Sequence, residues 1–511
     1  MIECYIRLMD GLLSVEGRCP GLAKKLQYWR KELKLNASTW RRETVGHEEQ
    51  LYTVKTTGTA KSGEPVYTLF TMPGFAHRVL EHCRENGIEF EWQDCRTPMP
   101  EPDYEAAFQG LRDYQCEAVA KMLDAGGGIL KAPTGAGKTI MSSAVIRAFP
   151  RKEMIARGTP LYVFTCADND INRKNWEEFK QLFPDRNVGL VSGSVHRYSD
   201  DIQVVTLDSL KNIDANLVGV LIVDEMHTAE SDSRAATISS FRKAAKWGVS
   251  ATPTGRFDGK NLVAEGLFGP IVASFEYEEM VERGAIVPIK VYWIPAPPPP
   301  SIDKYHSYHD RRAKVNYGAT LNMSFNKLVA RIVKAIPDEM QTMCMVQYLT
   351  QMAEIHFHAQ DVAYVHAETD PEKKNIRNTT VGAVSPKQRI ETYNKVRDGE
   401  IRKILSSYCW KQGVDFPALS VVVHASGGGS EIISKQVPGR ACRTADGKEC
   451  AYVVDFSHPW DREPPDEHGK RKPGPIASMD RSRRKAYEDL GFEQIEVQSF
   501  EDLPFISKEA K

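Results

Sequence analysis

The sequence lacks the features of a membrane or secreted protein. Its longest strongly apolar stretch, Leu217 to Val223, is far too short to span a bilayer, and residues 1–13 have no basic region ahead of an apolar one. The ten cysteines are scattered, with no CxxC pair and no paired metal-ligand spacing, so we interpret them as reduced thiols. We therefore expect a soluble cytoplasmic protein without a membrane partner.

An excess of charge of either sign is also missing. The chain has 67 Lys and Arg against 68 Asp and Glu, which excludes a polycation that coats nucleic acid nonspecifically. With 41% hydrophobic and 26% charged residues it is not disordered, and 511 residues correspond to about three domains. Any nucleic-acid site must therefore be a local patch.

Short apolar runs predict the organisation. Residues 66–94 combine extended runs with one helical segment, which indicates a small α+β unit that ends near residue 105. Two later series of apolar runs alternate with helical stretches, as in parallel sheets covered on both faces. Between them, Ile294 to Pro300 reads IPAPPPP, which is either a stiff spacer or a surface loop.

A phosphate-binding loop is the strongest local signal. Ala132 to Thr139 reads APTGAGKT, directly after a strand-like run and before an apolar helical stretch. Such glycines let backbone N–H groups surround phosphates at a helix N-terminus, while Lys138 reaches the β and γ phosphates and Thr139 holds Mg²⁺. Ala132 replaces the first glycine of the strict pattern, and a glycine-rich turn with an incidental lysine is the alternative interpretation.

Two further patterns complete a nucleotide site. The apolar run Leu217 to Val223 ends in Asp224 and Glu225, a position from which Asp224 can coordinate Mg²⁺ and Glu225 can activate water. Much later, QVPGRACR carries Arg440 and Arg443, which could stabilise transition-state charge from a second domain. Taken alone, the acidic pair would be a solvated turn and the arginines one exposed helix face.

The ordered set LRDYQ, APTGAGKT, DEMH, SATP and QVPGRACR resembles the motifs of superfamily 2 helicases and translocases over about residues 107–457. The resemblance implies an α/β protein with two tandem RecA-like domains that uses ATP and Mg²⁺. It assigns nucleotide binding to Gln115, Thr134, Gly135, Ala136, Gly137, Lys138, Thr139, Asp224, Gly413, Asp415 and Gln436. It assigns Mg²⁺ to Thr139 and Asp224, catalysis to Lys138, Glu225, Arg440 and Arg443, and coupling to His227, Ser250 and Thr252.

Within that superfamily, the small domain before LRDYQ and the run SATPTGRFDG resemble the UvsW, XPB and RecG group, which acts on duplex or branched DNA. Residues 481–497 are similar to a tail of phage proteins in this group, so a phage protein working in host cytoplasm fits. The resemblance implies DNA rather than RNA as the partner. Motifs that grip the strand depart from the family pattern, and Thr165, Thr206 and Ser407 are the candidates for that role.

Two basic clusters are candidate nucleic-acid surfaces. Residues 24–42 carry a net charge of +6 interleaved with aromatic residues, which suits phosphates and bases. The candidates from it are Lys24, Lys25, Trp29, Arg30, Arg41 and Arg42. Residues 470–485 also carry +6, and either cluster could instead be a solvated face.

The sequence thus predicts an ATP-dependent DNA helicase or translocase. The expected domains are an N-terminal α+β DNA-binding domain (1–105), RecA-like domain 1 (106–290), a Pro-rich linker (291–324), RecA-like domain 2 (325–460) and a basic tail (461–511). The alternatives are the duplex-DNA translocase of a restriction or defence system and a nucleotide-switched scaffold that binds a protein partner. A packaging motor is a weaker alternative, because it would leave QVPGRACR unexplained.

Overall fold

The computed structural model describes residues 2–35, 42–59, 65–229, 231–252, 261–373, 379–407, 410, 416–426, 439, 441–463 and 471–506. The chain divides into two compact units, one made of residues 1–133 and 137–275 and the other of residues 134–136 and 276–511. Within the described residues, no helix is both long enough and apolar enough to cross a membrane.

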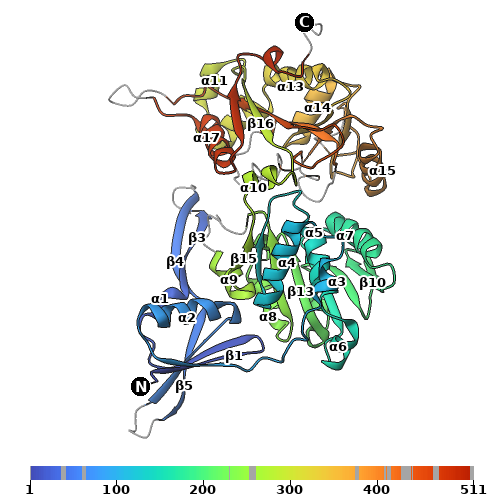
Figure 1. The fold of residues 1–511 in the computed structure, drawn as a ribbon. Helices are drawn as coiled ribbons and strands as arrows, with labels where there is room; N and C mark the ends of the chain where they lie inside the picture. The colour runs from blue at the N-terminus through green and yellow to red at the C-terminus, as the bar shows by residue number, and fades with distance from the viewer. Residues whose placement is uncertain are drawn as a thin grey trace. The chain divides into compact units, whose positions relative to one another are not determined.

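The N-terminal module is the α+β unit that the sequence predicts. Its sheet has the order β5-β6-β2-β1-β7, and helix α2 (Ala76–Glu85) packs against it (Figure 1). The strands are β1 (Cys4–Met9), β2 (Leu12–Gly17), β5 (Tyr52–Thr59), β6 (Pro65–Thr71) and β7 (Phe90–Asp94). Strands β3 (Gln27–Leu35) and β4 (Arg42–Gln50) form a separate antiparallel pair. Ile6, Leu13 and Val79 are fully buried in the core between sheet and helix.

The first unit also holds an eight-stranded sheet of order β11-β10-β12-β9-β13-β14-β8-β15. All its pairs are parallel except β10 with β11. The strands are β8 (Gly128–Lys131), β9 (Leu161–Cys166), β10 (Val188–Ser192), β11 (Val195–Arg197), β12 (Ile202–Thr206), β13 (Val218–Asp224), β14 (Ala245–Ser250) and β15 (Ile271–Ser274). Its helices include α4 (Asp113–Ala125), α5 (Lys138–Arg147), α7 (Asn169–Leu182), α8 (Asp232–Ser240) and α9 (Asn261–Phe268). Strand β13 is buried from Val218 to Val223, as expected of a parallel strand covered on both faces.

The second unit has one seven-stranded sheet, entirely parallel, of order β18-β19-β17-β20-β21-β16-β22. The strands are β16 (Ile289–Pro295), β17 (Gln341–Met345), β18 (Ala363–Val365), β19 (Lys403–Ser406), β20 (Leu419–His424), β21 (Ala451–Ser457) and β22 (Glu493–Glu496). Its helices include α13 (Met323–Ala335), α14 (Leu349–His358), α15 (Pro386–Arg397) and α17 (Pro475–Glu488). Two parallel-sheet domains behind an α+β module confirm the predicted fold class.

Two expected boundaries differ in the structure. The linker expected at 291–324 begins as β16, which pairs with β21 and β22, because its apolar residues Val291, Trp293 and Ile294 are buried in the sheet. The tail expected at 461–511 supplies α17 and β22 to the same unit. The second domain therefore extends on both sides of the range 325–460.

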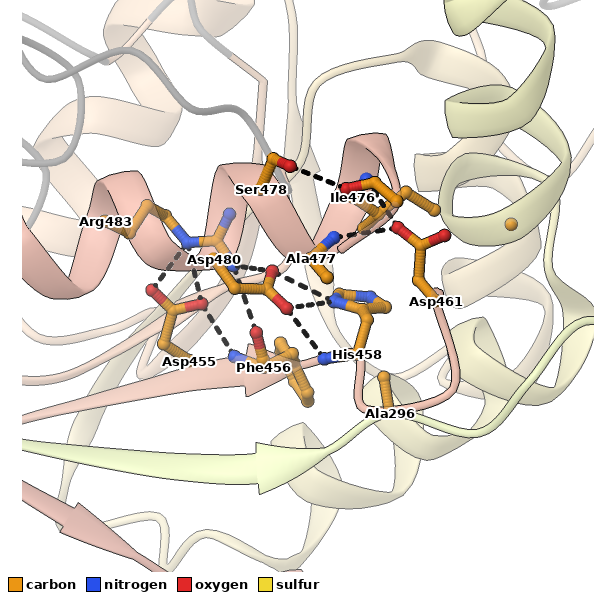
Figure 2. A network of polar contacts seen from close by, with 12 residues as sticks. Ala296, Asp455, Phe456, His458, Asp461, Ile476, Ala477, Ser478, Asp480 and Arg483 are labelled. Carbon is orange, nitrogen blue, oxygen red and sulfur yellow. Dashed lines mark hydrogen bonds and ion pairs between the residues drawn. The ribbon is translucent and has the colours of Figure 1, made fainter. Parts of the chain in front are cut away.

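A buried ionic network fixes α17 to β21 (Figure 2). Arg483 of α17 is fully buried, and its Nε lies 3.0 Å from Oδ2 of Asp455 on β21. Its Nη2 donates to Oδ1 of Asp480 at 3.0 Å, and Asp480 in turn accepts the backbone N–H of His458 at 2.7 Å. Asp461 accepts the N–H groups of Ile476 and Ala477 at the start of α17, at 2.7 and 2.8 Å. Arg483 is thus a structural anchor, although the sequence placed it in a basic surface cluster.

Candidate nucleotide-binding site

The sheet order of the first unit brings three of the predicted motifs to one edge. Strands β13, β14 and β8 are neighbours, with Asp224 opposite Val249 and Ser250 opposite Lys131. In parallel strands the carboxyl ends share one edge, which is where α/β proteins bind ligands. The acidic pair, Ser250 and the loop that leads from β8 to α5 therefore meet there.

The loop between β8 and α5 depends on glycine. Gly135 and Gly137 have φ of +91° and +82°, a region that other residues rarely adopt. A Cβ at Gly137 would lie 2.4 Å from Nε2 of Gln115, so the position excludes side chains for steric reasons as well. Lys138 begins α5, and its Nζ donates to the carbonyl oxygens of Ala132 and Pro133 at 3.2 and 3.4 Å. The ammonium group of Lys138 therefore lies against the loop that precedes α5. Thr139 is the next residue in the first turn of this helix.

Gln115 lies beside this loop and caps its own helix. Its Oε1 accepts the backbone N–H of Arg112 at 3.0 Å, and its side chain is buried. This capping box orients the amide at the start of α4, next to Gly137. The predicted contact with the adenine edge stays a prediction.

Asp224 ends β13 as a half-buried carboxylate, and Glu225, Lys138 and His227 are the charged groups that act on it. Burial, together with the neighbouring Glu225 carboxylate, raises the pKa of Asp224 to about 6, against the opposing effect of Lys138. Its Oδ1 accepts the backbone N–H of Glu225 at 3.0 Å. A carboxylate that has lost part of its water favours a cation, and carboxylate and hydroxyl oxygens are ligands that suit Mg²⁺. The chemistry of these side chains therefore fits Mg²⁺, and Asp224 and Thr139 are the residues that would hold it.

Glu225 stands in a strained backbone conformation. Among the described residues it alone, glycine apart, has positive φ, at 47°. A left-handed conformation costs a non-glycine residue about 1–2 kcal/mol, so the surrounding structure must hold it there. Its Oε2 is buried without a hydrogen bond and lies 3.4 Å from Nδ1 of His227. A carboxylate acceptor held in this way is suited to orient water and accept a proton.

His227 connects the acidic pair to the next strand. Its Nδ1 lies 3.1 Å from Oγ of Ser250 at the end of β14, and Ser250 Oγ also accepts the N–H of Thr252 at 3.1 Å. His227 and Ser250 are both buried. The three predicted coupling residues thus form one hydrogen-bonded chain that begins next to Glu225.

The remaining nucleotide candidates are residues 134–136 of the loop before α5 and residues of the second domain. Thr134, Gly135 and Ala136 group with the second unit, and so does Arg443, whose backbone pairs with Ile286. Gly413, Asp415, Gln436 and Arg440 lie outside the described residues. Their predicted roles stay predictions.

The three residues that the resemblance predicts to contact a DNA strand have buried side chains. Thr165 lies in β9, where its Oγ1 has no hydrogen-bond partner, and Thr206 ends β12, where its Oγ1 donates to Ser209 Oγ at 2.8 Å. Ser407 follows β19 of the second unit and is buried as well. Thr165 and Thr206 come at the same edge of the first sheet as the nucleotide candidates.

Only part of the N-terminal basic cluster, residues 24–42, is exposed and free to contact nucleic acid. Lys24 and Lys25 are exposed at the end of α1 (Leu22–Lys25), and Trp29 is 58% exposed. Arg30 instead pairs with Glu49 at 3.4 Å and with Asp232 at 3.1 Å. Arg41 lies outside the described residues, and Arg42 begins β4.

Lys24 and Lys25 line a surface pocket that the sequence did not reveal. His77 and Arg78 of α2 share its wall with Glu265 of α9. Arg78 donates to both oxygens of Glu265, at 2.7 and 2.6 Å, which ties the module to the large sheet's helix. Nothing in the spacing of these residues along the chain signals that they meet.

Each of the two parallel-sheet domains matches a known protein family. The family described as "Type III restriction enzyme, res subunit" matches residues 109–255, and "Helicase conserved C-terminal domain" matches residues 327–445. Among solved structures, S. cerevisiae Dbp5 bound to RNA and ADP BeF3 has a TM-score of 0.51 at 12% identity, covering 77% of this chain and 96% of Dbp5. The type ISP restriction-modification enzyme LlaBIII bound to DNA has a TM-score of 0.50 at 14% identity, covering 83% and 34%. These two likenesses concern the fold.

Similar sequences are themselves named helicases or translocases. "Putative helicase 22" of Sulfolobus islandicus filamentous virus is 24% identical over 69% of this chain and 65% of its own length. The DNA 3'-5' translocase XPB2 of Sulfurisphaera tokodaii is 25% identical over 67% of this chain and 80% of its own. This chain thus spans slightly less than two thirds of the viral relative. The two matched families, in this order, and the two named relatives support a superfamily 2 helicase.

Proposed function

We propose that the protein is an ATP-dependent DNA helicase or translocase that unwinds or remodels duplex or branched DNA, with Mg²⁺ as cofactor. The observation that carries this proposal is the meeting of Lys138, Asp224, Glu225 and the His227–Ser250 pair at one sheet edge. Phosphoryl transfer needs a phosphate cradle, a metal carboxylate and an acceptor for the proton of water. The first unit supplies side chains for all three.

Each residue has a distinct task in ATP hydrolysis. Lys138 exchanges its loop carbonyls for the β and γ phosphates. Thr139 and Asp224 would hold Mg²⁺, which would supply positive charge to the phosphates. Glu225 orients a water molecule and takes its proton as the water oxygen bonds to the γ-phosphorus and the bond to ADP breaks. Arg443, with Gln436 and Arg440, completes the site from the second domain, and Gly413 and Asp415 contact the nucleotide when the domains close.

The hydrogen-bonded chain of His227, Ser250 and Thr252 transmits the presence or absence of the γ-phosphate to the residues that contact the DNA strand. Because His227 lies 3.4 Å from Glu225 and 3.1 Å from Ser250, a shift of the glutamate moves the residues that follow β14. Thr165 and Thr206, at the same edge, and Ser407 in the second unit are the proposed strand contacts. Alternating grips of the two domains would then move the protein along one strand.

We assign the N-terminal module a supporting DNA contact. Lys24 and Lys25 are exposed cations for phosphates, although Lys25 lies 3.7 Å from Glu85, and the exposed indole of Trp29 offers a stacking surface. Arg30 contributes less, because Glu49 and Asp232 already neutralise it. Replacing Lys24 and Lys25 with alanine should lower the salt dependence of DNA binding by about one unit of slope per lysine.

The experiment that tests strand separation uses a forked duplex with a fluorophore and a quencher on opposite strands. We expect ATP with Mg²⁺ to separate the strands, and Glu225→Gln to bind the fork without separating it. Intact duplex in the presence of rapid ATP hydrolysis would contradict the helicase assignment.

A second candidate is translocation along duplex DNA without strand separation. The first domain matches the res subunit of type III restriction enzymes, and the restriction enzyme LlaBIII has a similar fold. Displacement of a third strand from linear duplex, with no opening of a fork, would favour this candidate.

A further inference from the structure

Three cysteines from separate segments of the N-terminal module converge on one point. Cys4 begins β1, Cys19 lies in the turn after β2, and Cys83 lies in the last turn of α2. The Sγ atoms of Cys19 and Cys83 are 3.7 Å apart, and all three sulfurs lie within 4.8 Å of one another. In the described part of the chain, no other set of three or more metal-ligating side chains comes together in this way.

The backbone holds these segments in place. Cys4 pairs with Gly17 in the β1–β2 register and with Phe90 in the β1–β7 register, so its position is fixed on both sides. Gly17 has φ of +107°, and a Cβ there would lie 2.5 Å from the carbonyl oxygen of Glu3, so glycine is needed for the turn that carries Cys19. The convergence is therefore built into the sheet and its turn.

The separation of the Cys19 and Cys83 sulfurs matches a thiolate metal site. With a zinc–sulfur bond of about 2.3 Å, two sulfurs of a tetrahedral site lie about 3.8 Å apart. The Cys19–Cys83 separation of 3.7 Å already has this value, and the sulfur of Cys4 lies within 4.8 Å of both. Cys4 and Cys83 are fully buried and Cys19 is partly exposed, so an ion would enter from the Cys19 side and find its fourth ligand there.

Two simpler interpretations compete with a metal site. Buried cysteines often serve as small apolar core residues, and Leu22, Val79 and Ile88 do surround these three. Core packing alone, however, does not require three sulfurs to face one another from three segments. The second interpretation is a disulfide between Cys19 and Cys83, which needs an oxidant, whereas metal binding needs none.

We propose that Cys4, Cys19 and Cys83 bind one Zn²⁺ ion as three thiolates. Each thiol gives up its proton to solvent when its sulfur bonds to zinc, and no electron is transferred. Burial raises the pKa of Cys4 and Cys83 to about 12 and that of Cys19 to about 11, so without metal the group is three neutral thiols. The ion would tie the turn before α1 to β1 and α2, and so hold Lys24 and Lys25 in place.

The test measures metal on the full chain, purified under reduction and without chelator. We expect about one zinc per chain by elemental mass spectrometry, and at least a roughly tenfold loss of zinc affinity in Cys19→Ser. Cys19 is chosen because it is partly exposed, and circular dichroism checks that the variant folds. Cys95→Ser is the matched control, since Cys95 is an exposed thiol outside the group, and it should keep its zinc.

Cobalt gives an independent spectroscopic signature. Co²⁺ added to metal-free protein should produce thiolate-to-cobalt charge-transfer absorption that weakens in Cys19→Ser and not in Cys95→Ser. No zinc and no such absorption in the reduced chain would overturn the proposal. A Cys19–Cys83 disulfide in metal-free protein purified without reductant would also overturn it in favour of a redox pair. Both readouts are independent of ATP hydrolysis, so they stand whether or not the helicase assignment holds.

Discussion

Two aspartates, one in each parallel-sheet unit, show opposite solutions to the same physical problem, the loss of water around a carboxylate. Asp224 ends β13 and Asp455 lies in β21, and burial alone would raise the pKa of both. Arg483, with hydrogen bonds from His424 and Tyr487, instead holds the pKa of Asp455 well below its usual range. Asp224 has the Glu225 carboxylate next to it, and its pKa rises to about 6.

The difference between the two aspartates indicates that Asp455 has a structural role, and it supports the proposed functional role of Asp224. A buried carboxylate that the chain pairs with its own cation anchors one element to another, as Asp455 anchors α17. A half-buried carboxylate beside a second acid is a strained arrangement that a bound metal ion would relieve. We therefore expect the same substitution to act on stability in one unit and on activity in the other.

The largest expected effect is on turnover. Asp224→Asn should lower kcat for ATP hydrolysis roughly 10²–10³-fold, because a charge that stabilises the transition state through the metal is lost. Its melting temperature should stay unchanged or rise slightly, since a half-buried carboxylate is removed. Steady-state ATPase and thermal melting on the same preparations check both. A large drop in melting temperature would show that Asp224, like Asp455, is structural.

In the second unit we expect the opposite outcome, a loss of stability rather than of ATP hydrolysis. Arg483→Met should destabilise that unit by about 3–5 kcal/mol, because Asp455 and Asp480 are left buried without their cation. Urea denaturation followed by tryptophan fluorescence measures this loss. The matched control is Arg484→Met: Arg484 pairs at the surface with Glu496, and its loss should cost about 1 kcal/mol or less. Equal effects of the two substitutions would contradict the anchor assignment.

Acid should act on the two aspartates in different ranges of pH. Mg²⁺ needs the Asp224 carboxylate, so its affinity should fall as the pH drops through about 6, by roughly tenfold per unit below it. Protonation removes the unfavourable half-buried charge, so this group stabilises the fold at lower pH rather than weakening it. Asp455 has a lowered pKa, so its stabilisation is present at neutral pH and is lost only in strong acid. Magnesium titrations of nucleotide binding at several pH values test the first point, and Asp224→Asn should flatten the dependence.

The smallest expected effect concerns the loop that faces Asp224. Gly137→Ala should weaken nucleotide binding by about 1–2 kcal/mol, because alanine is strained at φ of +82°. Its Cβ would also meet Gln115, so adding Gln115→Ala should restore part of the binding. Equilibrium titration with a fluorescent ATP analogue measures both variants. Complete restoration would show that the contact, and not the backbone, sets the requirement for glycine.

Local patterns predicted much of this molecule. The apolar run at 217–223 became β13, and the glycine-rich loop, Asp224, Glu225 and Ser250 meet because parallel strands share an edge. The range expected as a linker from residue 291 begins inside β16, because the proline-rich run starts only at the last residue of this strand, Pro295. Arg483 looked like a surface cation, because spacing along the chain does not show that Asp455 faces it. The cluster of Cys4, Cys19 and Cys83 could not be predicted for the same reason, because Cys19 and Cys83 are separated by 64 positions in the sequence.

Steady-state ATP hydrolysis at fixed salt tests the central claim most directly, with no nucleic acid, single-stranded DNA, linear duplex, forked or four-way DNA, and RNA compared side by side. We predict strong stimulation by DNA, greatest with branched DNA, and its loss in Lys138→Ala and Glu225→Gln while both variants stay folded. Hydrolysis that persists in either variant would contradict the site. Stimulation by RNA alone would contradict the DNA assignment, and no stimulation by any nucleic acid would favour a nucleotide-switched scaffold.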